Sequence, residues 1–142
     1  MNAYLELKKR HQTEFNTFPM VFAFTQEDLE KGMRKLGLDP TEKDKVCSLF
    51  GAGDIIRKSD VETYKSMSLR HRRELEDAIK ADRTGRGFIF DMFLYELSAN
   101  EYGFTEDASD TLEALGITWD DLEQNAPLKH GFDMACKKLS NW

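Results

Sequence analysis

The sequence predicts an α+β protein that is predominantly helical, with six or seven helices around a buried central helix and a small antiparallel sheet. Apolar residues recur at spacings of three and four over most of the chain, which is typical of amphipathic helices. Short runs rich in aromatic and β-branched residues, at 20–24, 46–50 and 54–57, are typical of strands. With 142 residues, 40% of them hydrophobic, and no long linker, we expect a single domain over residues 1–142.

The first third of the chain is expected to begin with a helix and continue into a strand. Residues 3–18 form an amphipathic helix that Pro19 ends, because proline cannot continue it. The apolar run 20–24 is too short for a helix and is expected to be a buried strand. Thr25 is placed to cap the next helix, and Gly37 suits its C-terminal end.

The segment after Pro40 has two interpretations. Residues 46–50 and 54–57 flank the glycine turn 51–53, which favours a hairpin of two short strands. The alternative is a helix capped by Asp39. We favour the hairpin.

The second half of the chain is expected to be helical throughout. A capping box at Ser59–Glu62 opens a long helix over about 60–82, which Gly85 and Gly87 end. Residues 88–102 carry apolar side chains at nearly every helical azimuth, so the other helices should enclose this central helix. Three shorter helices are expected over residues 107–115, 119–124 and about 128–139.

Charge is divided unevenly along the chain. The 42 residues Gly87–Leu128 contain ten acidic residues and no Lys or Arg, whereas residues 1–86 carry 17 basic and 15 acidic residues. Some of these acidic residues are expected at helix N-termini, where the helix dipole stabilises negative charge. The others must face the basic helix at 60–82, solvent or a cationic partner. The residues that we predict to bind a partner are Glu106, Asp107, Asp110, Glu113, Asp120, Asp121 and Glu123.

Two carboxylates of the central helix are the catalytic candidates of this sequence. Asp91 and Glu96 interrupt an otherwise apolar surface, and buried carboxylates whose pKa values differ can perform acid–base catalysis. The alternative is a structural ion pair with Arg57 or Arg72, or a contact with a helix N-terminus. A small hydrolase or transferase is therefore the rival to a binding protein.

A stretch that begins at Asp82 partly resembles a calcium-binding loop. Four residues match its pattern of oxygen ligands, glycine and an aliphatic side chain: Asp82, Thr84, Gly87 and Ile89. Arg86 and Phe93, however, stand where the motif needs a further ligand and its bidentate Glu. We therefore expect no calcium site here.

No other motif indicates a metal or a cofactor. The glycines of 51–53 lack the spacing of either nucleotide-binding fingerprint, so a hairpin turn is the better interpretation. The three histidines, His11, His71 and His130, show no metal-ligand spacing to one another or to a cysteine. The prediction is a protein with no metal and no cofactor.

The chain is expected to be cytoplasmic. No apolar run is long enough to cross a bilayer, and residues 1–10 lack the apolar core of a signal peptide. Cys47 and Cys136 are expected to be small buried thiols rather than a disulfide. Neither a membrane nor nucleic acid is expected as a direct partner, because the formal net charge is −6.

Three stretches carry a resemblance to a known family: Gly51–Asp60, Gly85–Leu97, and Glu101-Tyr102 together with Leu112–Gly116. They resemble a family of small acidic bacterial proteins of unassigned function, over about Phe18 to Leu139. The resemblance implies no catalytic residue. The resemblance does imply that the protein is encoded on a mobile element, because such proteins are often found on phage or plasmid-like elements.

These observations together predict a non-enzymatic interaction protein. Its acidic C-terminal half would bind a basic surface on a nucleic-acid-handling protein, as a mobile-element-encoded inhibitor of the anti-CRISPR or DNA-mimic type. A homodimer that uses Trp119 or Trp142 is a third hypothesis.

Overall fold

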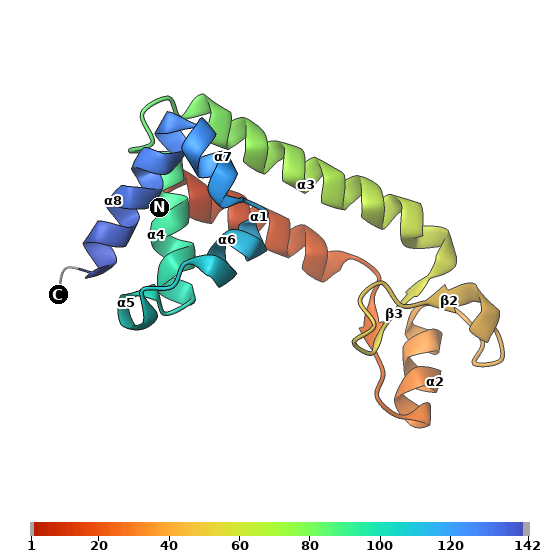
Figure 1. Ribbon diagram of the computed structural model, residues 1–142. Helices are drawn as coiled ribbons and strands as arrows, with labels where there is room; N and C mark the ends of the chain where they lie inside the picture. The colour runs from red at the N-terminus through yellow and green to blue at the C-terminus, as the bar shows by residue number, and fades with distance from the viewer. Residues whose placement is uncertain (1, 141–142) are drawn as a thin grey trace. The chain divides into compact units, whose positions relative to one another are not determined.

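The computed structural model describes residues 2–140, which fall into two compact units (Figure 1). Unit 1 combines Met1–His11 with Arg73–Trp142, and unit 2 is Gln12–Arg72. Within residues 2–140 the chain forms eight α-helices and three short strands, which confirms the predominantly helical α+β class. No helix in this range is long and apolar enough to cross a membrane. The single domain over residues 1–142 stays a prediction.

The elements follow the order α1 (Ala3–Thr17), β1 (Val21–Phe22), α2 (Gln26–Lys35), β2 (Val46–Cys47), β3 (Asp54–Arg57), α3 (Val61–Ala81), α4 (Phe88–Ala99), α5 (Tyr102–Thr105), α6 (Ser109–Leu115), α7 (Trp119–Gln124) and α8 (Ala126–Ser140). Short 3-10 turns cover Lys43–Lys45 and Lys58–Asp60. The second of these turns leads directly into α3, and in it Asp60 accepts a hydrogen bond from Arg57.

Unit 2 is built on an antiparallel sheet of order β1-β3-β2, so the expected hairpin of β2 and β3 is confirmed. The central strand places Ile56 in the core with no exposed surface. The outer strands are shorter than the runs 20–24 and 46–50, and β1 is not the buried strand that was expected, because Val21 is only partly buried and Phe22 is 55% exposed. Phe24 and Phe50, at the ends of those runs, are 77% and 52% exposed. The strands end where the hydrogen bonds between neighbouring strands end, and the apolar residues beyond that point are not part of the sheet.

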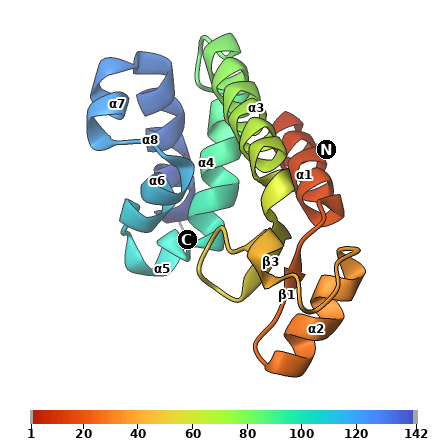
Figure 2. The same cartoon turned by 90° about the vertical axis from the view of Figure 1, so that its right-hand side faces the viewer.

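Helix α2 lies against β1 in unit 2 (Figure 2). The Thr25 hydroxyl accepts a hydrogen bond from the backbone N–H of Asp28 at 3.0 Å, so the predicted cap is confirmed. Gly32 meets Val21 of the strand so closely that an added Cβ would lie 2.7 Å from a Val21 methyl carbon. The missing side chain thus permits the contact between helix and strand.

Unit 2 also contains a cluster of aromatic side chains. The ring of Tyr64, on α3, meets Phe18 edge-on at 5.4 Å and Phe50 at 5.9 Å between centroids. Phe15 of α1 lies 6.5 Å from both Tyr64 and Phe50. Edge-to-face packing of this kind adds to the stabilisation from burial alone.

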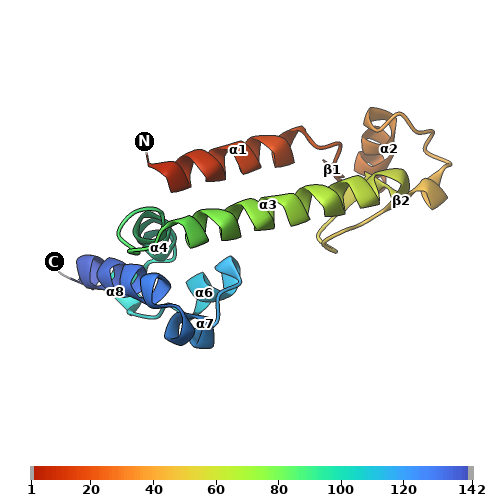
Figure 3. The ribbon, with the colours of Figure 1, turned by 90° about the horizontal axis from the view of Figure 1, so that it is seen from above.

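Unit 1 is centred on α4, and α8 packs along it (Figures 1 and 3). Four residues of α4 are completely buried: Ile89, Met92, Phe93 and Leu97. Phe93 meets Phe132 of α8 edge-on at 5.2 Å between centroids. The inner face of the central helix is thus buried as expected, but the other helices do not enclose it fully, because Tyr95, Ser98 and Ala99 are exposed. The helix ends at Ala99 rather than at residue 102, because Glu101 adopts a left-handed conformation with φ of 61°.

The turn between α3 and α4 touches the N-terminal part of α8 through two glycines. Gly85 has φ of +78°, and an added Cβ would lie 2.0 Å from the Pro127 carbonyl oxygen. A Cβ on Gly131 would lie 2.5 Å from the Gly85 carbonyl oxygen. Only glycine fits at these two positions, so the close backbone approach fixes how α4 enters the core of unit 1.

Candidate interaction surface

Seven exposed carboxylates lie on α6, on α7 and on the turn before α6. We call them the acidic surface: Glu106, Asp107, Asp110, Glu113, Asp120, Asp121 and Glu123. All seven residues lie in unit 1. The residues predicted to bind a partner are therefore solvent-facing.

The helices that carry the acidic surface are held from beneath by apolar side chains. Ala108, Leu112 and Leu115 are buried in the core of unit 1, as is Leu122 of α7. The buried residues and the acids alternate with helical periodicity, so α6 and α7 bury one face and present the other. Thr111 is also fully buried, and its hydroxyl lies 3.5 Å from the Glu96 carbonyl oxygen. The acids are thus presented by anchored helices.

Some of the acids serve local structure, as expected for residues near helix N-termini. Asp121 and Thr118 form a capping box, with hydrogen bonds of 2.8 and 3.0 Å. Asp107 accepts a hydrogen bond from the backbone N–H of Ser109 at 2.9 Å, and this bond lowers the pKa of Asp107. Asp120 accepts one from Gln124 at 3.0 Å. Helix capping therefore accounts for part of the surface.

No member of the acidic surface forms an ion pair with a Lys or Arg of unit 1 in the part of the chain that the structure describes. The charge of Glu123 acts on Lys129 of α8. The pKa of Lys129 is raised first by a hydrogen bond to Asp133, at 3.2 Å, and only in small part by the charge of Glu123. Within residues 2–140, the charge of the surface is therefore not balanced by contact ion pairs.

Two glutamates, one of them a member of the acidic surface, have unusual backbone conformations. Glu101 and Glu106 have φ of 61° and 54°, and they bracket the four-residue helix α5 at its two ends. Left-handed backbone is costly for a residue with a side chain. No sequence pattern pointed to these positions, because glycine is the usual residue there.

Glu96, one of the two catalytic candidates, is tied into a structural contact. Its carboxylate accepts a hydrogen bond from the Tyr4 hydroxyl at 2.7 Å and pairs with Lys8 at 3.2 Å. Burial, followed by this hydrogen bond, raises the pKa of Tyr4 far above its ordinary value. The alternative of a structural ion pair is correct in kind, but the partner is Lys8, not Arg57 or Arg72. Arg57 instead pairs with Asp60 at 2.7 Å.

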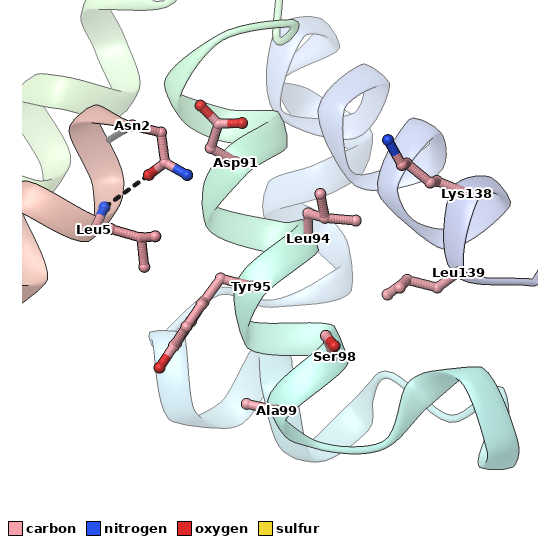
Figure 4. A pocket seen from close by; sticks show the side chains of 9 residues that line it. All are labelled: Asn2, Leu5, Asp91, Leu94, Tyr95, Ser98, Ala99, Lys138 and Leu139. Atoms are coloured by element: carbon pink, nitrogen blue, oxygen red, sulfur yellow. Dashed lines mark hydrogen bonds between the residues drawn. The ribbon is translucent and has the colours of Figure 1, made fainter.

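Asp91, the other candidate, lines an open groove of about 680 Å³ in unit 1 (Figure 4). The groove lies over one face of α4, between the N-terminal turn of α1 and the C-terminal part of α8. Its lining residues are Asn2, Leu5, Asp91, Leu94, Tyr95, Ser98, Ala99, Lys138 and Leu139. Glu96 is not among them, so the structure does not bring the two carboxylates into one cavity.

The stretch that resembles a calcium loop is organised by the carboxylate of Asp82 itself. Asp82 accepts backbone hydrogen bonds from Gly85, Gly87 and Ile89 at 2.9 to 3.1 Å, and these bonds lower its pKa against the opposing effect of burial. The carboxylate therefore caps α4, whose own N-cap residue, Gly87, has no side chain to do so.

The glycine turn of unit 2 contains a second such carboxylate. Asp54 has no exposed surface, and it accepts hydrogen bonds from the Ser48 hydroxyl and from the backbone N–H groups of Leu49, Phe50 and Ala52 at 2.6 to 3.1 Å. Burial would raise the pKa of Asp54, but these hydrogen bonds lower it to about 2. The glycine-containing loop thus surrounds an anion that belongs to the same chain.

The histidines lie in separate contacts. His11 Nε2 is 3.5 Å from Glu74 in unit 1, whereas His71 Nε2 is 3.3 Å from Glu14 in unit 2. His130 accepts a hydrogen bond from Arg86 at 3.5 Å. Within residues 2–140, no group of three or more His, Cys, Asp or Glu side chains is placed to hold a metal ion. Both cysteines are free and partly buried.

The tryptophans of the dimer hypothesis differ in what the structure shows. Trp119 is 56% exposed and packs edge-on against Phe132 at 5.8 Å between centroids. Trp142 lies outside the described residues. The hypothesis that either forms a subunit interface stays a prediction.

These features define a predominantly helical α+β protein with two compact units and an exposed acidic surface on one of them. The chain belongs to a family of unknown function, DUF7659, whose model matches residues 3–138. Membership confirms the resemblance to a family without an assigned activity. No curated protein and no solved structure matches the chain.

Proposed function

We propose that this chain is a non-enzymatic interaction protein that binds a basic protein surface through its acidic surface. The observation that supports the proposal is the exposure of all seven carboxylates without a paired Lys or Arg in the described part of unit 1. Concentrated charge of one sign speeds encounter with a surface of the opposite sign and selects against partners of like charge.

The partner that this chemistry fits is a nucleic-acid-handling protein, because such proteins carry clusters of Lys and Arg that normally contact phosphates. An acidic surface on rigid helices would compete with the nucleic acid for the same cations. The chain would then act as an inhibitor of the DNA-mimic or anti-CRISPR type, and a mobile-element origin would agree with that role.

The test is capture of partners by an immobilised chain, compared between wild type and two triple variants. In the first variant, Asp110→Asn, Glu113→Gln and Glu123→Gln remove three charges from the acidic surface. In the control, Glu6→Gln, Asp44→Asn and Glu62→Gln remove three exposed charges elsewhere. Both variants have the same net charge, so a difference between them reports on the position of the charges.

We expect the first variant to lose the basic partner and the control to retain it. Partner binding should also weaken steeply as salt rises, because exposed charges are screened. Duplex DNA should displace the chain from the partner if the two share one site. Equal capture by both variants, or recovery of no basic partner, would contradict the proposal.

A hydrolase or transferase that uses Asp91 is the second candidate. The groove beside Asp91 favours it, whereas the pairing of Glu96 with Lys8 leaves no second carboxylate there for acid–base work. A screen with ester, phosphoester and glycoside substrates, run with wild type and Asp91→Asn, distinguishes the two functions. Turnover that disappears in the variant would support the enzyme, and absence of turnover in the wild type would count against it.

A further inference from the structure

The groove over α4 is a second surface of unit 1 that the proposed function does not use. Four of its residues, Asp91, Leu94, Tyr95 and Ser98, follow one another at helical spacing on the outer face of α4. Leu5 of α1 and Leu139 of α8 line its two sides. Most of the lining is apolar, and Tyr95 is 41% exposed. The groove shares no residue with the acidic surface.

Two opposite charges mark one end of this groove. Figure 4 shows Asp91 and Lys138 on opposite sides of Leu94, at the same end of the groove. In the described part of the chain neither side chain forms an ion pair or a side-chain hydrogen bond. The groove therefore presents an apolar centre, one carboxylate and one ammonium group.

We propose that a second copy of this chain covers the groove, in a dimer with two-fold symmetry. In such a dimer the same patch of both copies forms the interface, so each residue meets its counterpart reciprocally. A two-fold axis parallel to α4 that passes between Asp91 and Lys138 places the Asp91 of each copy opposite the Lys138 of the other. The same axis brings the two Leu94 side chains together.

The charges of the groove favour a second copy over a partner that carries charge of only one sign. A basic partner would meet Lys138, and an acidic partner would meet Asp91, so each would leave one like-charge contact. A second copy supplies one opposite charge for each. The apolar residues between the pairs then exclude water from the centre of the interface, as in stable protein interfaces. This dimer leaves the acidic surface of both copies uncovered by its interface residues.

The test is the molar mass of the full chain in solution, measured by sedimentation between about 1 µM and about 500 µM, a range that covers weak and tight dimers. The proposal predicts twice the mass of the chain at the upper end. Asp91→Lys and Lys138→Asp should each weaken the dimer by roughly 30-fold or more, because each creates two like-charge contacts. The double variant, with the two charges exchanged, should restore it.

Two controls separate this interface from general effects. Lys137→Asp makes the same charge change on an exposed neighbour in α8 that does not line the groove, so it should leave the dimer intact. Ser98→Arg introduces a bulky side chain at an exposed position inside the groove and should abolish the dimer without disturbing the core. The helical circular dichroism of every variant reports whether it still folds.

A monomer at all concentrations would overturn the proposal. A dimer that Ser98→Arg leaves intact would also overturn it, as would failure of the exchanged double variant to dimerise. If the chain stays monomeric and the amide signals of Leu94 and Ser98 shift when a basic protein is added, the groove belongs to that partner and not to a second copy.

Discussion

The two units of the chain use their acidic residues in different ways. Unit 2 carries ten basic and ten acidic residues, whereas unit 1 carries ten basic and sixteen acidic residues, so the net charge of −6 resides entirely in unit 1. Several acids of unit 2 are paired: Glu14 with Arg70, Glu27 with Lys31, Glu42 with Lys45, and Asp60 with Arg57. The acidic surface of unit 1 has no such pairs among the described residues. Charge supports local structure in unit 2 and is left in excess in unit 1.

The two units nevertheless share one structural feature, a carboxylate whose hydrogen bonds organise a loop. Asp54 in unit 2 and Asp82 in unit 1 each accept three or more hydrogen bonds from nearby backbone N–H groups or hydroxyls. Charged acceptors strengthen such bonds. A carboxylate that accepts several hydrogen bonds from a loop therefore supports the fold in both units, and the units differ in the excess of acids on α6 and α7 of unit 1.

The largest loss of stability is expected for Gly85→Ala in unit 1. The added Cβ would lie 2.0 Å from the Pro127 carbonyl oxygen, and backbone cannot move aside as a flexible side chain can. The substitution should lower the free energy of unfolding by about 3–5 kcal/mol, in the range of severe packing changes. Urea denaturation measures it.

The matched control is Gly37→Ala in unit 2. Gly37 has the same φ of +78°, but an added Cβ there has nothing within 4 Å. It should cost only the strain of left-handed backbone, about 1 kcal/mol. Equal losses for the two variants would show that the close approach of Gly85 to α8 is not important for stability.

The next-largest loss of stability is expected for the two carboxylates that organise loops, Asp54 and Asp82. Asp54→Ala should destabilise the protein by about 3 kcal/mol, because it leaves the partly buried N–H groups of Leu49, Phe50 and Ala52 without their acceptor. Asp82 is partly exposed, so water can replace part of its bonds, and Asp82→Ala should cost about half as much. Thermal unfolding of both variants tests the order, and a larger loss for Asp82→Ala would reverse our account of the two loops.

A pH titration should reveal the paired acids of unit 2. The Arg70 guanidinium, with a further bond from His71, lowers the pKa of Glu14 from 4.5 to about 2 against the opposing effect of desolvation. A pKa that is lower in the folded state contributes stability that is complete above the unfolded value and is lost as pH falls through the folded value. Stability should therefore fall between about pH 4.5 and pH 2.

Glu14→Gln should be less stable than wild type at neutral pH and should show a shallower loss over that acidic range. Urea midpoints at several pH values measure both features. If the variant showed the same pH dependence as wild type, Glu14 would not be a cause of the loss of stability at low pH.

The smallest effect is a stabilisation in unit 1. Glu106→Gly replaces a left-handed residue, with φ of 54°, by one that adopts this conformation without strain. Stability should rise by about 0.5–1 kcal/mol. If Glu106 contributes to partner binding, the same variant should bind more weakly than wild type, although it is more stable. A more stable variant with unchanged affinity would exclude Glu106 from the interface.

Much of the fold could be predicted from the sequence where local signals are strong. The capping residue Thr118 and the stop before Pro127 predicted α7 at its observed bounds, and the residues 54–57 form a strand as expected. The partners in long-range ion pairs could not be predicted in this way. Lys8 and Glu96 are 88 positions apart, and no local pattern connects them. The same holds for α5, whose ends depend on left-handed glutamates that propensity disfavours.

The candidate surface was also only partly predictable. The excess of acids between Gly87 and Leu128 is visible in the sequence, but their exposure depends on which faces of α6 and α7 are buried. The groove beside Asp91 combines residues from both ends of the chain, so only the folded structure reveals it.

The most direct test of the central claim is to map a captured basic partner onto the chain by the amide signals of the complex. Our account predicts that the signals that shift most belong to residues 106–123 of unit 1, and that they return as salt is raised. Shifts centred on unit 2, whose acids and bases balance, would contradict it.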